Sequence, residues 1–282
     1  MGGITVKSLN PLIFREYDIR GVVGEDLSPE VVHTLGRAYG TFLRMHGVKK
    51  AVVGRDCRLS SASYSKSMAG GLAASGLDVI DIGMVTTPVF YFARLHYGVE
   101  GGAMVTGSHN PAEFNGLKLA FGPDTLYGDG IQEIRRIAEK GDFADGSGAI
   151  ETADPVPAYV DDVTGRIVLG PHKVKAVVDC GTGAAGPVTR QVLTRIGADF
   201  EEMYFEPDGT FPNHHPDPTQ KKNIEELAQR VRDTGAALGI GFDGDADRIG
   251  VVDENGRPVW GDELQVIYWK EILGEHPGAL AL

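Results

Sequence analysis

Short apolar runs that favour strands alternate with helical patterns along most of the chain. In the first part, we expect strands at 48–54, 77–82 and 102–106, and helices at 61–75 and 89–97. Glycine or proline turns separate these segments, as at Gly76 and 86–88. Strands and helices that alternate in this way are typical of βαβ units around a mostly parallel sheet.

A polar segment divides this pattern in two. Residues 140–157 (KGDFADGSGAIETADPVP) are rich in Gly, Pro and acidic residues and lack periodicity, so we expect a linker. The pattern then restarts, with strands expected at 174–179 and 199–204 and a helix at 188–196. The similar runs VKKAVVGRDCR and HKVKAVVDCGT indicate an internal repeat of roughly 125 residues. The predicted fold class is therefore α/β, with two similar tandem domains and mixed, mostly parallel sheets.

A further unit begins after Gly261. We expect a helix over 262–273 and the start of a strand over 279–282. The predicted domains are 1–150, 151–256 and 257–282, the last being the truncated start of a third domain. Because half of an α/β unit would leave apolar surface unpaired, we expect the sequence to be a fragment of a longer protein.

Composition narrows the classes of protein. The 27 basic and 39 acidic residues give a net charge of −12, which offers no broad positive surface to nucleic acid. Two cysteines, Cys57 and Cys180, cannot build a disulfide framework, and the N-terminal sequence lacks a signal-peptide pattern. With no apolar run near the roughly 18 residues of a membrane span, we expect a cytoplasmic protein without a membrane partner.

An acidic loop is the first candidate for chemistry. Residues 243–248 read DGDADR between two apolar runs, so carboxylates at alternate positions can converge on one point. Hard oxygen ligands without a nearby His or Cys suit Mg²⁺ better than Zn²⁺. A solvated acidic turn or a weak Ca²⁺ loop stays open as an alternative, although the EF-hand pattern with Gly at its sixth position is absent.

A serine in the sequence TGSHNP is the second candidate. Ser108 follows a predicted strand and has His109 beside it, so the serine could act as a nucleophile or carry a phosphate. An ordinary turn closed by Pro111 is the alternative. The segment does not match the G-x-S-x-G elbow of serine hydrolases, because Asn110 stands in place of the second glycine.

Cations near glycine turns could bind phosphate, although each could equally be a surface ion-pair partner. These candidates are Arg15, Arg20, Arg55, Arg58, Lys118 and Arg248. The pair His214–His215 is a poor metal site, since adjacent side chains in an extended loop usually point apart.

A glycine-rich turn points to a different class of protein. Gly181, Gly183 and Gly186 follow a predicted strand as GTGAAG, and Glu201 comes 20 residues after Gly181. This spacing matches the dinucleotide-binding fingerprint of oxidoreductases. A tight βα turn also requires glycines without any nucleotide, so both interpretations remain open at this point.

Six motifs, taken in order, resemble the α-D-phosphohexomutase family, and most closely its bacterial phosphomannomutase/phosphoglucomutase branch. They are FREYDIRG (14–21), GRDCRLSS (54–61), TGSHNPAEFNGLK (106–118), VVDCGTGAAG (177–186), PDGTFPNHHPDP (207–218) and FDGDADRIGVV (242–252). The resemblance covers almost the whole chain. It also disfavours the oxidoreductase interpretation, because family members carry a similar glycine turn without binding a dinucleotide.

The resemblance implies a role for each matching residue. Ser108 would be the phosphoserine, and Asp243, Asp245 and Asp247 would hold Mg²⁺ together with a phosphate oxygen on Ser108. Lys118, His109 and Arg20 would transfer protons and orient the reacting hydroxyl, while Tyr17, Arg20 and Arg248 would contact the substrate. As a base, Lys118 would need a depressed pKa, which Arg20 and Mg²⁺ could produce.

The implied reaction converts a hexose 6-phosphate to its 1-phosphate through a hexose 1,6-bisphosphate. FREYDIRG favours glucose and mannose phosphates over the glucosamine phosphate of phosphoglucosamine mutases. Family enzymes have four domains, with the sugar-reading loop in the third and the clamp for the second phosphate in the fourth. The alternative is therefore a non-catalytic fragment that keeps the metal and phosphoserine sites. The sequence does not predict an oligomeric state.

Overall fold

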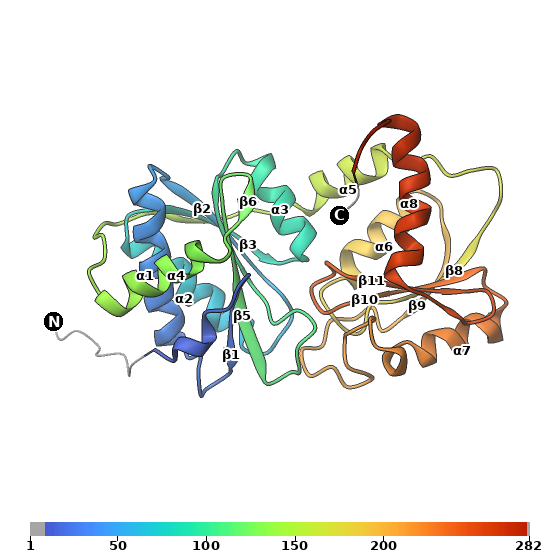
Figure 1. Cartoon of the computed structure of the whole chain (residues 1–282), viewed down its shortest axis with the longest axis horizontal. Coiled ribbons are helices and arrows are strands. Elements are labelled where there is room, and N and C mark those ends of the chain that lie inside the picture. The colour runs from blue at the N-terminus through green and yellow to red at the C-terminus, as the bar shows by residue number, and fades with distance from the viewer. Residues whose placement is uncertain (1–8, 281–282) are drawn as a thin grey trace.

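Two α/β units follow one another in the computed structural model, which describes residues 9–280 (Figure 1). The sheet of the first unit has the order β1-β5-β4-β2-β3-β7, with β6 paired to β5. β2, β3, β4 and β7 are parallel, whereas β1, β5 and β6 run antiparallel to their neighbours. The strands are β1 (Ile19–Val22), β2 (Lys50–Arg55), β3 (Asp78–Met84), β4 (Gly101–Val105), β5 (Phe114–Phe121), β6 (Asp124–Thr125) and β7 (Ile150–Thr152).

Helices cover both faces of this sheet. Ala51 and Val53 of β2 are buried with α1, α2 and α4 on one face, and Val52 is buried with α3 on the other, as strand alternation requires. The helices of this part of the chain are η1 (Pro11–Ile13), α1 (Pro29–Met45), α2 (Ser61–Ala74), α3 (Thr87–His96), α4 (Asp129–Lys140) and α5 (Val156–Gly165).

The second unit has a sheet of order β12-β11-β10-β8-β9. Val177 is buried against α7 on one face, and Val178 is buried with Ala185 and Phe205 on the other. Figure 1 shows α6 and α7 on opposite sides of this sheet. The elements are β8 (Lys175–Asp179), α6 (Gly186–Arg195), β9 (Asp199–Met203), η2 (Lys221–Asn223), α7 (Glu225–Thr234), β10 (Leu238–Phe242), β11 (Ile249–Asp253), β12 (Pro258–Val259) and α8 (Gly261–Glu275).

The two sheets share a topological core, which confirms the predicted repeat and the α/β fold class. The order β5-β4-β2-β3 in the first sheet corresponds to β11-β10-β8-β9 in the second. In each set of four, three neighbouring strands are parallel and the fourth is antiparallel. The serine loop after β4 and the acidic loop after β10 therefore occupy equivalent places in the two units.

Apolar side chains join the units beside these loops. Val160 of α5 and Val188 of α6 belong to the same buried cluster as Val89 and Phe90 of α3. In Figure 1, α5 lies between the two sheets. This packing places the N-terminal end of α3 next to the acidic loop of the second unit.

The predicted linker over 140–157 is wrong in part. Its residues Ile150–Thr152 form β7, which pairs with β3 at the sheet edge, and α5 already begins at Val156. All three residues of β7 are exposed, so the strand lacks the apolar alternation by which a sequence pattern is recognised.

The helix expected after Gly261 is present as α8, and only Leu264 of that helix is buried. Five of its apolar side chains are 40–59% exposed: Val266, Ile267, Tyr268, Ile272 and Leu273. Residues 279–280 form no strand, and the rest of the strand expected there lies outside the described residues. Within 9–280, no helix is long and apolar enough to cross a membrane.

Candidate functional site

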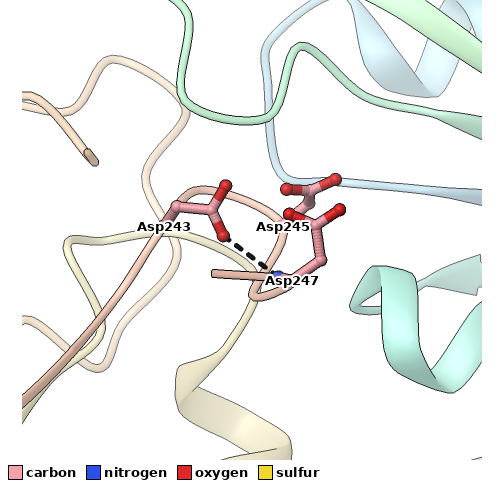
Figure 2. Close-up of side chains that lie close together, drawn as sticks. All are labelled: Asp243, Asp245 and Asp247. Carbon is pink, nitrogen blue, oxygen red and sulfur yellow. Dashed lines mark hydrogen bonds between the residues drawn. The ribbon is translucent and has the colours of Figure 1, made fainter. Parts of the chain in front are cut away.

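The acidic loop joins β10 to β11 and gathers three carboxylates. Asp243, Asp245 and Asp247 each offer an oxygen within 4.8 Å of the others (Figure 2). Oδ1 of Asp243 accepts hydrogen bonds from the backbone N–H groups of Asp247 and Arg248, both at 3.0 Å. The first carboxylate thus folds the loop so that the other two turn toward the same point.

Three carboxylates this close together repel one another unless positive charge lies nearby. Burial raises the pKa of Asp243, and repulsion from Asp245 and Asp247 raises it further. Nζ of Lys118 lies 2.7 Å from Oδ2 of Asp245 and 2.5 Å from Oδ2 of Asp247. Burial opposes the charged form of Asp245, but Lys118 outweighs it and lowers the pKa of this carboxyl.

One buried oxygen in the loop has no partner. Oδ1 of Asp245 accepts no hydrogen bond from any group in residues 9–280, although its side chain is fully buried. A buried carboxylate oxygen normally has a partner, and three converging carboxylates provide the hard oxygen ligands that Mg²⁺ prefers. The residues therefore fit a divalent cation.

Ser108 faces this loop from the first unit. Its hydroxyl donates to Oδ2 of Asp243 at 2.8 Å, and the side chain is almost fully buried. The backbone of Ser108 is left-handed, with φ of 48°, a conformation that is strained for a residue with a Cβ. Oγ1 of Thr106 accepts the backbone N–H of Ser108 at 2.8 Å. The turn thus directs Oγ across the interface between the units.

His109 is the second polar neighbour of the serine, with Nδ1 3.2 Å from Oγ of Ser108. Burial lowers the pKa of His109, and the positive charges of Arg248 and Arg20 lower it further. The imidazole is therefore neutral at pH 7 and can exchange a proton with the serine hydroxyl.

Lys118 lies on β5, where it pairs with Met104 of β4. The expectation of a depressed pKa is wrong for this structure. Burial alone would lower the pKa of Lys118, but the Asp245 and Asp247 carboxylates raise it above its usual range. The prediction considered the cations that would repel this ammonium group, but not the Asp245 and Asp247 carboxylates that bind it.

A pocket of about 420 Å³ opens in front of Ser108. Its lining includes six predicted site residues: Tyr17, Arg20, Ser108, Lys118, Asp247 and Arg248. Asp18, Tyr91 and Thr125 also line it and were not predicted. Of these, only Asp18 stood within a recognisable motif, FREYDIRG. A larger hollow of about 570 Å³, beside α7 and β12, contains none of the predicted site residues.

Two polar contacts in the pocket fix the orientation of Arg20. Arg20 donates to Oδ2 of Asp18 at 2.5 Å and to Oδ1 of Asn110 at 3.0 Å. Tyr17 is 70% exposed, so its ring is free to meet a ligand at the pocket entrance. Arg20 is thereby fixed beside the serine loop.

Thr87 is a further residue in contact with the acidic loop, and the sequence did not reveal it. Its hydroxyl donates to Oδ2 of Asp245 at 2.7 Å, and its backbone N–H donates to the Asp245 carbonyl at 2.9 Å. The two residues are 158 positions apart, and Thr87 begins α3 in the first unit. A threonine at a helix start looks like an ordinary cap in sequence, so no local signal could identify this role.

Arg58 is not a phosphate contact, contrary to its place among the candidate cations. Its side chain is completely buried beneath the serine loop rather than in the pocket. Arg15 and Arg55 do not line the pocket either. Of the six candidate cations, only Arg20, Lys118 and Arg248 line the pocket.

The glycine turn is packed by the protein itself. A Cβ on Gly183 would lie 2.8 Å from the Gly244 carbonyl oxygen, and one on Gly186 would lie 1.8 Å from that of Phe205. Glu201, which completed the spacing of the dinucleotide-binding fingerprint, pairs with the side chains of Lys175 and Arg230. Close packing of the backbone, against the acidic loop at Gly183 and against Phe205 at Gly186, therefore accounts for these two glycines without a nucleotide.

His214 and His215 do not share a ligand. Nε2 of His214 lies 2.9 Å from Oδ2 of Asp179, and its Nδ1 lies 3.0 Å from the His215 carbonyl oxygen. Both partners are acceptors, so the two contacts favour the doubly protonated form of the ring. Burial opposes this charge, but the Asp179 carboxylate outweighs it and raises the pKa of His214. The contact between His214 and Asp179 anchors the loop over 207–218.

Two α/β/α units that bring a serine loop against an acidic loop define the phosphohexomutase class of protein. Residues 11–145 match the model for phosphoglucomutase/phosphomannomutase α/β/α domain I, and residues 157–256 match the model for domain II. The chain belongs to the phosphoglucomutase/phosphomannomutase family.

Individual relatives agree with this assignment. The chain is 42% identical to the phosphomannomutase/phosphoglucomutase of Pseudomonas aeruginosa PAO1 and 38% identical to a phosphoglucomutase of Neisseria gonorrhoeae, covering 95% of this chain and 58% of each relative. A crystal structure of a family protein from Burkholderia thailandensis superposes with a TM-score of 0.91 at 40% identity, covering 95% of this chain and 60% of that one. The chain thus spans less than two thirds of the length of these relatives.

Proposed function

We propose that Ser108 carries a phosphoryl group and exchanges it with hexose phosphates, so that the chain provides the phosphoserine half of a phosphoglucomutase/phosphomannomutase. The observation that carries the proposal is the 2.8 Å contact between Oγ of Ser108 and Asp243, because it joins the serine of one unit to the acidic loop of the other. The names of the relatives support glucose and mannose phosphates as the substrate class.

The divalent cation is assigned to Asp243, Asp245 and Asp247, together with an oxygen on Ser108. Mg²⁺ is proposed because the ligands are all oxygen and one buried Asp245 oxygen lacks a partner within residues 9–280. When bound, Mg²⁺ supplies positive charge that offsets the negative charge developing on the transferring phosphoryl group.

The chain's own residues move the protons. When a hexose 1,6-bisphosphate phosphorylates the serine, the bond from phosphorus to the sugar oxygen breaks and a bond to Oγ of Ser108 forms. His109 accepts the Oγ proton, and the Lys118 ammonium gives a proton to the departing sugar oxygen. In the reverse direction, each proton returns along the same path.

Arg20, Arg248 and Tyr17 hold the substrate. The two guanidinium groups suit phosphate or hydroxyl oxygens of the sugar, and Asp18 fixes the orientation of Arg20. The exposed Tyr17 ring offers an apolar face to the sugar at the pocket entrance.

Intact-mass measurement tests this function. The purified chain is incubated with Mg²⁺ and glucose 1,6-bisphosphate, before and after phosphatase treatment, with Ser108→Ala as the control. A phosphoryl adduct on the wild type that is absent from Ser108→Ala supports the proposal, and no adduct on the wild type refutes it. A coupled assay from glucose 1-phosphate to glucose 6-phosphate then shows whether this chain alone also completes turnover.

A further inference from the structure

Arg58 lies directly beneath the serine loop and binds four of its carbonyl oxygens. Nη2 donates to the carbonyls of Ser108 at 2.7 Å and Asn110 at 2.6 Å. Nη1 donates to those of Pro111 at 2.7 Å and Phe114 at 2.9 Å. One planar guanidinium group therefore ties together the loop from the serine to the start of β5.

Asp56 completes the network at the other end of the loop. Its carboxylate accepts the backbone N–H of Gly107 at 3.2 Å and the Ser61 hydroxyl at 2.5 Å, and it forms an ion pair with Nε of Arg58 at 3.2 Å. Both charged side chains are at most 1% exposed. An ion pair removed from water in this way needs additional hydrogen bonds, which the Gly107 N–H and Ser61 hydroxyl provide for Asp56 and the loop carbonyls provide for Arg58, although Nε itself makes the ion pair without a hydrogen bond.

The loop is shaped around this arginine. A Cβ on Gly107 would lie 2.6 Å from Cζ of Arg58, so glycine is required there for the guanidinium to fit. The next residue, Ser108, has the left-handed backbone, and its carbonyl is one of those held by Arg58. A strained conformation persists only where its surroundings hold it, and here the arginine provides the hold.

Arg58 also contacts the second unit. The Phe211 ring stacks on its guanidinium group, with Cζ 5.0 Å from the ring centroid. A Cβ on Gly209 would lie 2.6 Å from Cα of Arg58, so the loop over 207–218 packs closely on this residue. The arginine thus lies where the serine loop meets the unit that carries the acidic loop.

We propose that Arg58 is a positioning residue for phosphoryl transfer: it holds Ser108 in its left-handed conformation so that Oγ meets Asp243. The inference rests on the proposed function of Ser108. Lysine cannot replace arginine here, because a single ammonium group with three donors cannot span four carbonyls and Asp56.

Arg58→Lys tests this role, and Arg94→Lys is the matched control. Arg94 is also a buried arginine of the first unit, but it donates to the carbonyls of Glu100 and Gly122, at the strand ends opposite the serine loop. Two readouts are compared with the wild type. The first is the rate of Ser108 phosphorylation by glucose 1,6-bisphosphate, and the second is amide hydrogen exchange over 106–116.

We expect Arg58→Lys to slow phosphorylation about 100-fold, as displacement of a reacting group by about 1 Å does, and to speed exchange over 106–116. Arg94→Lys should change neither readout. A rate for Arg58→Lys within about twofold of the wild type, or equal slowing by Arg94→Lys, overturns the inference.

The two readouts also separate this inference from the proposed function. If wild-type Ser108 takes up no phosphate, the proposed function fails, and the exchange measurement still decides the role of Arg58. In that case, faster exchange over 106–116 in Arg58→Lys alone supports the hold of Arg58 on the Ser108 backbone, and unchanged exchange overturns it.

Discussion

Thr87→Val removes a single hydroxyl from the proposed metal site while keeping its shape. In the wild type, this hydroxyl donates to Oδ2 of Asp245 at 2.7 Å in a buried setting. Hydrogen bonds to charged groups contribute about 1.5–3 kcal/mol, and about 1.4 kcal/mol corresponds to a tenfold change in affinity. We therefore expect the dissociation constant for a divalent cation to rise about 10- to 100-fold, the usual effect of changing a partner of a metal ligand.

The assay is a titration with Mn²⁺, a paramagnetic substitute for Mg²⁺, followed by electron paramagnetic resonance. Thr87→Ser keeps the hydroxyl and should bind Mn²⁺ nearly as the wild type does. Thr86→Val removes the hydroxyl of the adjacent helix cap, which accepts the Val89 N–H at 3.4 Å. This hydroxyl does not contact Asp245. The substitution should therefore lower stability and leave Mn²⁺ affinity unchanged. Equal Mn²⁺ affinity for Thr87→Val and wild type would refute the reasoning.

Three further predictions address other parts of the structure. Lys118→Met removes the ammonium group that competes for the acidic loop, so Mn²⁺ should bind at least about tenfold more tightly in the same titration; weaker binding would contradict this. Gly186→Ala places a Cβ 1.8 Å from a carbonyl oxygen and should cost about 2–3 kcal/mol in urea unfolding, whereas Gly165→Ala, in open space, should cost almost nothing. Because the Asp179 pair raises the pKa of His214, the stability lost in His214→Gln should be largest below about pH 6.5 and should shrink as pH rises through the folded-state pKa; a loss independent of pH would exclude the ion pair.

Local patterns in the sequence were enough to predict much of the fold. The alternation of strands and helices and the repeated strand-turn runs depend on neighbouring residues, and the structure confirms both. β7 could not be predicted, because it is a three-residue exposed edge strand that is stabilised by pairing with β3. The domain boundaries at 150 and 256 stay predictions.

The residues of the candidate site also fall into those that a local sequence pattern predicts and those that only the folded chain reveals. Ser108 and the acidic loop stand in compact motifs whose chemistry is visible in a few letters. Thr87 and Arg58 act through partners that only the folded chain brings near, so sequence alone missed the first and misassigned the second. A pattern gives the type of a side chain, but the side to which an arginine turns depends on the tertiary structure.

The serine and its carboxylate partner are far apart in the order of synthesis. Ser108 precedes Asp243 by 135 positions. At ribosomal rates of about 5–20 residues per second, that interval is on the order of ten seconds. Throughout it, the emerging chain carries a serine without the acidic loop, so the reactive alignment arises only once β10 has been made. In the proposed function, the alignment of serine and carboxylate therefore waits until the second unit has been made.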